Sequence, residues 1–157
     1  MTPAPTASAQ QLEHYLHEHI PLSRAMAVSV LAVSREQVRL AAPLAPNINH
    51  RDTVFGGSAA ALAMLAAWSL LHTRLAAEGR AARLVIQRNT MEYERPIAGD
   101  FSARAALEEP GRWQQFTDTL ARRGRARIGV TALLEYSGAI AGRLSGQFVA
   151  LAGADRR

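Results

Sequence analysis

The sequence predicts a single α+β domain in which an antiparallel sheet surrounds one long buried helix. The run Ala59–Ala77 is built largely of Ala, Leu and Met and is apolar nearly all round, which is typical of a buried helix. About six strand-like segments lie before and after it in runs instead of alternating with helices, an order that favours an antiparallel sheet. The length of 157 residues suits one domain. We expect this domain to span residues 8–152, with residues 1–7 frayed.

The first quarter of the chain predicts a helix followed by a hairpin. A helix is expected over Ser8–His19, because its first serine and the glutamine three places later have the spacing of a capping box. Pro21 should end it. Alternating apolar residues over 25–33 and again over 38–40, with a polar turn between them, predict two paired strands.

A loop and two glycines precede the central helix. The loop Pro43–Phe55 contains two prolines and two asparagines, so it should be irregular. Gly56-Gly57-Ser58 follows, and the helix then continues without a breaker as far as Gly79, which stands where a C-terminal cap belongs.

The C-terminal half predicts four strands and a short helix. Strand-like composition is found over 83–95 and 101–107, each ended by a proline-containing turn. Apolar residues spaced at i, i+3, i+4 and i+7 predict an amphipathic helix over 113–124, capped by its final glycine. Two more strands, 128–136 and 139–151, are joined by a Ser-Gly turn.

Composition excludes several classes of protein. The chain has no cysteine, which rules out disulfides, thiolate nucleophiles and zinc fingers. No apolar run reaches the roughly 18 residues of a membrane span, and the start has no signal-peptide pattern, so we expect a cytoplasmic protein without a membrane partner. The histidines at 14, 17 and 19 lack nearby carboxylates in a ligand pattern, so we expect no metal site and no cofactor.

The net charge of +5 comes from 18 arginines and no lysine. A basic protein can meet nucleic acid, a membrane surface or a phosphate-bearing molecule. Only four arginines cluster, at 122, 123, 125 and 127, and no aromatic residue lies among them. A nucleic-acid partner is therefore not expected.

Several motifs resemble those of a known family. The most specific is Pro46-Asn47-Ile48-Asn49 leading into Thr53-Val54-Phe55-Gly56-Gly57-Ser58, and Tyr93-Glu94-Arg95-Pro96-Ile97 and Gly124-Arg125-Ala126-Arg127-Ile128 add to it. Over about Leu12 to Leu151 the chain is similar to the putative thioesterase family named after the C-terminal domain of YiiD, found in bacteria. The resemblance implies a hotdog fold, a curved antiparallel sheet wrapped around one long central helix. It also implies a homodimer or larger homo-oligomer that acts on acyl groups carried by coenzyme A or acyl carrier protein.

The resemblance assigns the reacting centre to the start of the central helix. The first helical N–H groups lack partners within the helix, and at Gly56 and Gly57 they could hold the oxyanion of a thioester under attack. In the related PaaI-like branch an asparagine at the distance of Asn49 holds the carbonyl or the attacking water, and Asn47 is the reserve. The alternative for Asn49 is a loop-bracing residue.

The chain departs from the PaaI-like pattern at the catalytic base. That pattern has a histidine before the glycines and a carboxylate seven residues after the second, where this chain has Phe55 and Met64. We expect Asp52 to serve as base or to orient the water, with Glu92 and Glu94 next in line. An ordinary surface-loop aspartate is the alternative for Asp52.

Five further residues are expected to contact substrate. Phe55 occupies the position of the missing histidine. Ser58 contacts substrate or caps the helix, Trp68 lines an acyl tunnel or packs against the sheet, and Tyr93 borders the site or belongs to the core. Arg125, with its arginine neighbours, binds phosphates of coenzyme A or phosphopantetheine, or is simply solvated.

The leading functional interpretation is an enzyme that hydrolyses acyl thioesters. The alternative is a non-catalytic acyl-CoA binding or sensing module, which fits the absence of a carboxylate at Met64. A dehydratase or hydratase would need an acid–base pair that Phe55 and Met64 do not supply.

Overall fold

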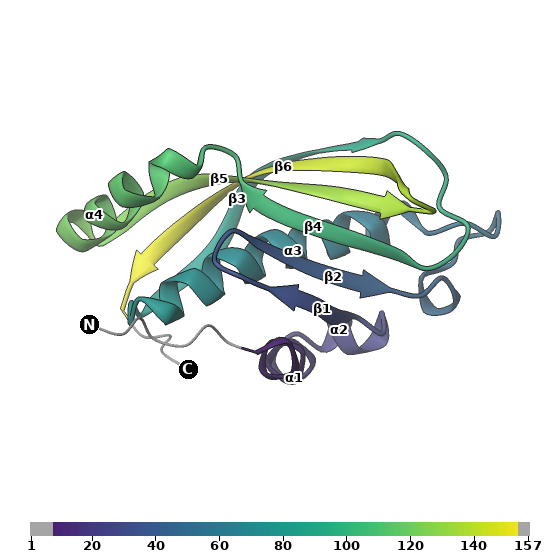
Figure 1. The fold of residues 1–157 in the computed structure, drawn as a ribbon, viewed down its shortest axis with the longest axis horizontal. Coiled ribbons are helices and arrows are strands. Elements are labelled where there is room, and N and C mark those ends of the chain that lie inside the picture. The colour runs from purple at the N-terminus through teal and green to yellow at the C-terminus, as the bar shows by residue number, and fades with distance from the viewer. Residues whose placement is uncertain (1–7, 154–157) are drawn as a thin grey trace.

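The computed structural model describes residues 8–153 and has the expected α+β architecture (Figure 1). The segment 1–7, expected to be frayed, lies outside the described residues. Within them, six strands form one sheet in the order β1-β2-β4-β5-β6-β3, with every neighbouring pair antiparallel. The strands are β1 (Ser29–Val33), β2 (Gln37–Ala42), β3 (Ala82–Tyr93), β4 (Phe101–Leu107), β5 (Arg125–Tyr136) and β6 (Ala139–Ala152).

The sheet wraps around the long helix α3 (Gly56–Ala77), as a hotdog fold requires (Figure 1). Eleven of its 22 residues are buried, and alanines such as Ala63, Ala66 and Ala67 are fully covered. Their small side chains let the helix approach the sheet closely. By length and composition alone α3 could also cross a membrane, but 61% of its most apolar window is buried inside the fold. It is therefore the core helix that the sequence predicted.

The predicted helix caps are confirmed at three places. Ser8 and Gln11 form the capping box, with the Ser8 N–H donating to Gln11 Oε1 (2.9 Å) and the Gln11 N–H to Ser8 Oγ (3.1 Å). Gly79 follows α3 with φ +68°, and Gly124 follows α4 (Trp113–Arg123) with φ +71°. Both glycines adopt the left-handed conformation that ends a helix at low cost.

The entry to the sheet differs from the prediction. Helix α1 (Ala9–His19) ends before Pro21 as expected, but Pro21 then begins a second helix, α2 (Pro21–Ala25), because proline suits the first position of a helix. The residues after α2 turn through Ala27, with φ +56°. Strand β1 therefore begins at Ser29 and is shorter than the predicted segment 25–33.

Residues 8–153 also contain two short 3₁₀ turns, and one of them lies in the loop predicted to be irregular. It covers Ala45–Asn47, and a single antiparallel bridge joins Ile48 to Val54 in the same loop. The other, Pro110–Arg112, leads into α4.

Helix α4 is tied to the far end of α3. The Trp113 indole donates to the Glu78 carboxylate (2.6 Å), and the Arg74 guanidinium lies 4.1 Å from the centre of the Trp113 ring. Strand β5 then begins at Arg125, three residues earlier than predicted.

Strand β3 forms one edge of the sheet. Among residues 8–153 it pairs with β6 alone, so the N–H and C=O groups along its outer side have no neighbouring strand. The register with β6 sets Met91 and Tyr93 on the side of α3, and Arg88 and Glu92 on the outer, convex side of the sheet.

Candidate functional site

The first turn of α3 presents three N–H groups without partners. Among the described residues, the N–H groups of Gly56, Gly57 and Ser58 have no acceptor, and no side chain caps the helix. The flanking N–H groups are used: the Phe55 N–H donates to the Asn47 carbonyl (2.7 Å) and the Ala59 N–H to the Phe55 carbonyl (3.0 Å). Free N–H groups and the positive end of the helix dipole thus meet at one point.

Two exposed aromatic rings flank this point. The Tyr93 hydroxyl donates to the Gly56 carbonyl (3.1 Å), and a Cβ on Gly56 would lie 3.4 Å from the Tyr93 ring. The Phe55 ring lies against Gly57 so closely that a Cβ there would overlap it. Phe55 and Tyr93 are 58% and 59% exposed. Glycine at these two positions leaves room for the rings, and the rings leave an apolar border around the free amides.

The Tyr93–Ile97 segment fastens this border to the rest of the sheet. The Arg95 guanidinium donates to the carbonyls of Tyr136 (2.6 Å) and Ala139 (3.2 Å), which flank the β5–β6 turn. The Ile97 carbonyl accepts from the Val54 N–H (2.8 Å), just before the glycines. The motif therefore holds the loop, the helix start and the end of β3 together.

The two asparagines of the loop are engaged in holding its shape. Asn49 Oδ1 accepts from the N–H groups of Arg51 (2.8 Å) and Thr53 (3.2 Å), and its Nδ2 donates to Thr53 Oγ1 (2.9 Å). This is the loop-bracing alternative. Asn47 is 2% exposed and donates to the carbonyls of Met26 (3.0 Å) and Pro43 (2.8 Å), while its Oδ1 is buried without a partner among residues 8–153.

The structure separates the three candidate acids. Asp52 is exposed, with φ +62°, in the turn that Asn49 braces, and its carboxylate has no partner among residues 8–153. Glu92 lies on the convex side of β3, away from the glycines. Glu94 pairs with Arg143 (2.8 Å), which also lies on the convex side. Asp52 is thus the acid that lies in the same loop as the helix start.

Three other predicted residues fall outside this cluster or contribute differently. Ser58 lies in the first turn of α3 and not at its cap, and its hydroxyl has no hydrogen bond within the described part of the chain. Trp68 lies eleven residues along α3, about 16 Å from Gly57. Arg125 is at the opposite end of the sheet: it pairs with Leu151, nine residues along β6 from Gly142, which pairs with Tyr93, a span of about 30 Å.

Trp68 belongs to a stack of aromatic rings between α3 and α1. Its ring centre lies 4.7 Å from that of His72 at an angle of 11°, and the Tyr15 ring lies 4.7 Å from His72 and 6.1 Å from Trp68. The Trp68 indole donates to the Leu84 carbonyl of β3 (3.3 Å). Burial lowers the pKa of His72, and the neighbouring His19 lowers it further.

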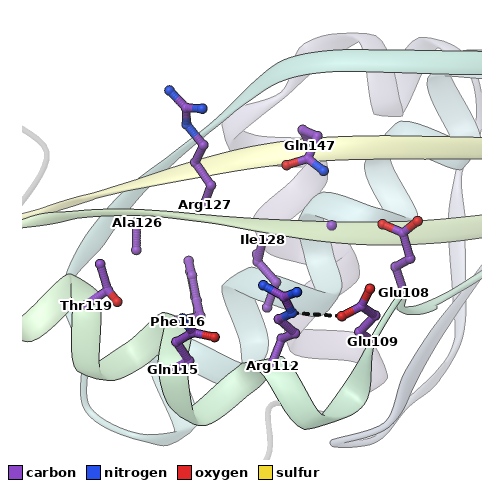
Figure 2. Close-up of a pocket in the computed structure, with 11 residues that line it drawn as sticks. Glu108, Glu109, Arg112, Gln115, Phe116, Thr119, Ala126, Arg127, Ile128 and Gln147 are labelled. Atoms are coloured by element: carbon purple, nitrogen blue, oxygen red, sulfur yellow. Dashed lines mark hydrogen bonds and ion pairs between the residues drawn. The ribbon is translucent and has the colours of Figure 1, made fainter.

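A cavity of about 330 Å³ lies elsewhere, between α4 and strands β5 and β6 (Figure 2). Its lining mixes charges, with Glu109 paired to Arg112 (2.7 Å) and Glu108 packed against Gly129. No local motif in the sequence marks this cavity, because it forms between segments that only folding brings together. The residues described contain no group of three or more His, Asp or Glu side chains placed to bind a metal ion.

Comparison with known proteins gives a family and a fold. The model of the family described as Putative thioesterase (yiiD_Cterm) matches residues 9–152. A protein of unknown function from Chlorobaculum tepidum TLS has a similar structure, with a TM-score of 0.87 and 25% identity over 94% of this chain and 99% of that one. A putative thioesterase from Shewanella oneidensis gives a TM-score of 0.80 and 22% identity over 91% and 96% of the two chains. A thioesterase from Haemophilus influenzae gives 0.73 and 14% over 97% and 96%.

The aromatic stack predicts a pH dependence of stability. Because the pKa of His72 is lower in the folded chain than in the unfolded chain, the unfolded state binds more protons as the pH falls below about 6.5. The contribution of neutral His72 to the free energy of unfolding should therefore be fully present above this pH and be lost as the pH falls through the folded pKa. The free energy of unfolding, measured with urea, should fall less between pH 7.5 and pH 5.5 in His72→Phe than in the wild type. The exposed control His14→Phe should keep the wild-type loss, and an equal loss in all three proteins would contradict the assignment.

Proposed function

Because the chain belongs to the YiiD C-terminal family of putative thioesterases, we propose that it hydrolyses acyl thioesters of coenzyme A or acyl carrier protein at the start of α3. The observation that carries this proposal is the set of free N–H groups at Gly56, Gly57 and Ser58, bordered by two aromatic rings. A thioester carbonyl is the group that such a site would polarise.

The chemistry needs a carbonyl, a water molecule and a proton acceptor. Water attacks the thioester carbon, a C–O bond forms, and negative charge develops on the carbonyl oxygen. The amides of Gly56 and Gly57 hold that oxyanion, with the helix dipole adding to its stabilisation. The proton acceptor takes one proton from the attacking water. The C–S bond then breaks, the thiolate leaves and takes up that proton, and the acyl group departs as the free acid. The chain's own residues act at each step without forming a covalent acyl intermediate.

Asp52 is the residue we assign as base or water-orienting group. Its carboxylate is free of other partners among residues 8–153, and it lies four residues before Gly56 in the loop that Asn49 braces. In this assignment Asn49 acts through the loop: its bonds to Arg51 and Thr53 hold the turn whose left-handed residue is Asp52. Asn49 is then a positioning residue, whereas Asp52 touches the water.

The acyl chain would follow the side of α3 that the sheet leaves partly covered. From Gly57 this side continues through Met64 and Leu65 to Trp68, all partly buried against the core. Phe55 and Tyr93 border its entrance. Trp68, held by its stack with His72, would stand at the far end of this path.

We also propose that two copies join through their β3 edges. An unpaired twelve-residue edge strand invites a second strand. Antiparallel pairing of two β3 strands would set the Arg83 end of one copy beside the Tyr93 end of the other. Arg125 and Arg83 both pair with Leu151, so this arrangement would also bring Arg125 of one copy toward the glycines of its partner.

A non-catalytic acyl-thioester sensor is the second candidate, and one observation favours it. Met64 stands on α3 where the PaaI-like pattern has a carboxylate, and Asp52 is an exposed loop residue. Binding of acyl-CoA without turnover on chains from short to long would make the sensor the better conclusion.

Gly57→Val should reduce hydrolysis of acyl-CoA by about 100-fold or more, the size of effect seen when one oxyanion donor is lost, because the carbonyl oxygen could no longer reach the donor. The added side chain would occupy the approach to the free amides, and the exposed Phe55 ring can rotate away, so folding should be retained. Turnover and far-UV circular dichroism would be measured together. Gly111→Val is the matched control, because nothing lies within 4 Å of a Cβ at Gly111. A folded Gly57→Val enzyme with full activity would remove the oxyanion role.

Asp52→Asn should lower kcat by about 10²- to 10⁴-fold while KM stays near the wild-type value, as expected for loss of a general base. Asparagine tolerates the left-handed conformation of this position, so the loop should be preserved. Asp118→Asn on α4 serves as the control with the same loss of charge. A fall of less than about threefold would exclude Asp52 as base.

Sedimentation velocity at micromolar concentration tests the pairing of β3 edges. We expect a species of at least twice the 17.0 kDa of one chain. Hydrogen exchange should then show protection along both sides of β3. A 17.0 kDa species would count against the dimer and against the proposed sharing of Arg125.

A further inference from the structure

Four arginines project from one region of the convex face of the sheet. Arg83 of β3 and Arg125 of β5 both pair with Leu151 of β6, so all three side chains share that face. The next rows hold Arg127 and Arg88 on the same face. Figure 2 shows Arg127 pointing away from α4, on the side opposite the cavity's helix wall. We call this set the arginine face: Arg83, Arg88, Arg125 and Arg127.

None of these four guanidinium groups has an ion pair or a side-chain hydrogen bond among residues 8–153. All four residues are exposed. Five other arginines of the described chain do have carboxylate partners: Arg35, Arg80, Arg104, Arg112 and Arg143. Arg122 and Arg123 are also exposed, in the last turn of α4. The face therefore carries positive charge that no ion pair neutralises among residues 8–153, although the Glu108 carboxylate lies over Gly129, two residues from Arg127 on the same face.

The size and centre of the arginine face indicate the kind of partner. Arg83 and Arg125 are two strands apart, about 10 Å, and Arg83 and Arg88 are about 17 Å apart along β3, wider than a single phosphate group. Val85, 49% exposed, lies in the row between them. An apolar centre within a charged border is the composition of a protein interface. The face has no aromatic residue on which a base could stack, and its charge opposes a second copy of itself.

We infer that the arginine face docks an acidic protein that carries the acyl group on a flexible arm. This inference rests on the proposed function, and within it selects the carrier-protein thioester over the coenzyme A thioester as the substrate. Arg88 lies five residues from Tyr93 along β3, about 17 Å, and on the other side of the strand. A thioester docked on this face reaches the glycines only on a long arm, because the glycines lie at the opposite face of the sheet, beside Tyr93. In the proposed dimer the face of one copy lies nearer the glycines of its partner.

The test compares two substrates that share an acyl group. Octanoyl-CoA and the octanoyl thioester of a bacterial acyl carrier protein are hydrolysed by the wild type and by the double variant Arg88→Gln with Arg127→Gln. We expect kcat/KM for the carrier-protein substrate to fall about tenfold or more, with stronger salt dependence in the wild type, because rim charges act mainly on the rate of encounter. For octanoyl-CoA we expect a change of less than about twofold. Arg24→Glu on α2 changes the net charge equally and should leave both substrates within the same limit.

Several outcomes would overturn the inference. An equal fall on both substrates would mean that the arginines bind phosphates of coenzyme A, and no fall on either would leave the face without a role in docking. A change in sedimenting mass, or a loss confined to binding of a 20-nucleotide RNA, would identify a second copy or a nucleic acid as the occupant. If the wild type hydrolyses neither thioester, the proposed function fails by itself. In that case, binding of the holo carrier protein to the immobilised wild type and double variant still tests the docking. The inference is supported only if the variant binds the carrier protein at least about tenfold more weakly.

Discussion

Packing of α3 against the concave face of the sheet determines where the first turn of the helix, and the site proposed there, can lie. A helix with half of its residues buried must enter and leave the core at fixed points, and its first turn emerges beside the end of β3. The loop before it satisfies its own polar groups, through Asn49 and through the bond between Phe55 and Asn47, and so leaves the first N–H groups of the helix free. The same packing places Tyr93, 37 residues from Gly56, in contact with that first turn.

Much of this arrangement was predictable because local signals and packing agreed. The capping box at Ser8, the glycine after α3 and the alternation along β4 each point to one structure, and each is confirmed. The extent of β1 was wrong, because a proline that stops one helix can equally begin another, and only the packing of α2 decides between them. The cavity beside α4 has no local signature, since Glu108 and Gln147 meet only in the folded chain.

Prediction of the site was limited because distance along the sequence does not say on which face of the sheet a side chain lies. Nearness in sequence favoured Asp52 as the acid, with Glu92 and Glu94 next in line. Strand alternation turns Glu92 outward, and an ion pair with Arg143 holds Glu94 on the convex side. Arg125 was grouped with the substrate contacts because arginine suits phosphate. The structure places it at the end of the sheet that lies away from the glycines of the same chain. In the proposed dimer, Arg125 would approach the glycines of a second copy, and the sequence of one chain does not describe that arrangement. For Asn49 the sequence left two alternatives, bracing the loop and acting in catalysis. Its hydrogen bonds brace the turn that carries Asp52, so in the proposed assignment the two roles are linked.

The proposed site combines free amides at the start of α3 with the absence of the charged residues that the PaaI-like pattern has beside them. Phe55 and Met64 remove the charged groups of the PaaI-like pattern, and the Phe55 ring covers one side of the helix start instead. An apolar border of this kind strengthens the interaction between free amides and a developing negative charge, because it excludes water from one side.

The central claim is that the amides at the start of α3 polarise the substrate carbonyl, and infrared difference spectroscopy tests it most directly. The ligand would be a ketone analogue of acyl-CoA in which a methylene replaces the thioester sulfur, labelled with carbon-13 at the carbonyl. We predict that binding shifts the carbonyl stretch to lower frequency than in water, and that Gly57→Val abolishes this shift. A bound carbonyl that absorbs at the same or higher frequency than in water would contradict the account.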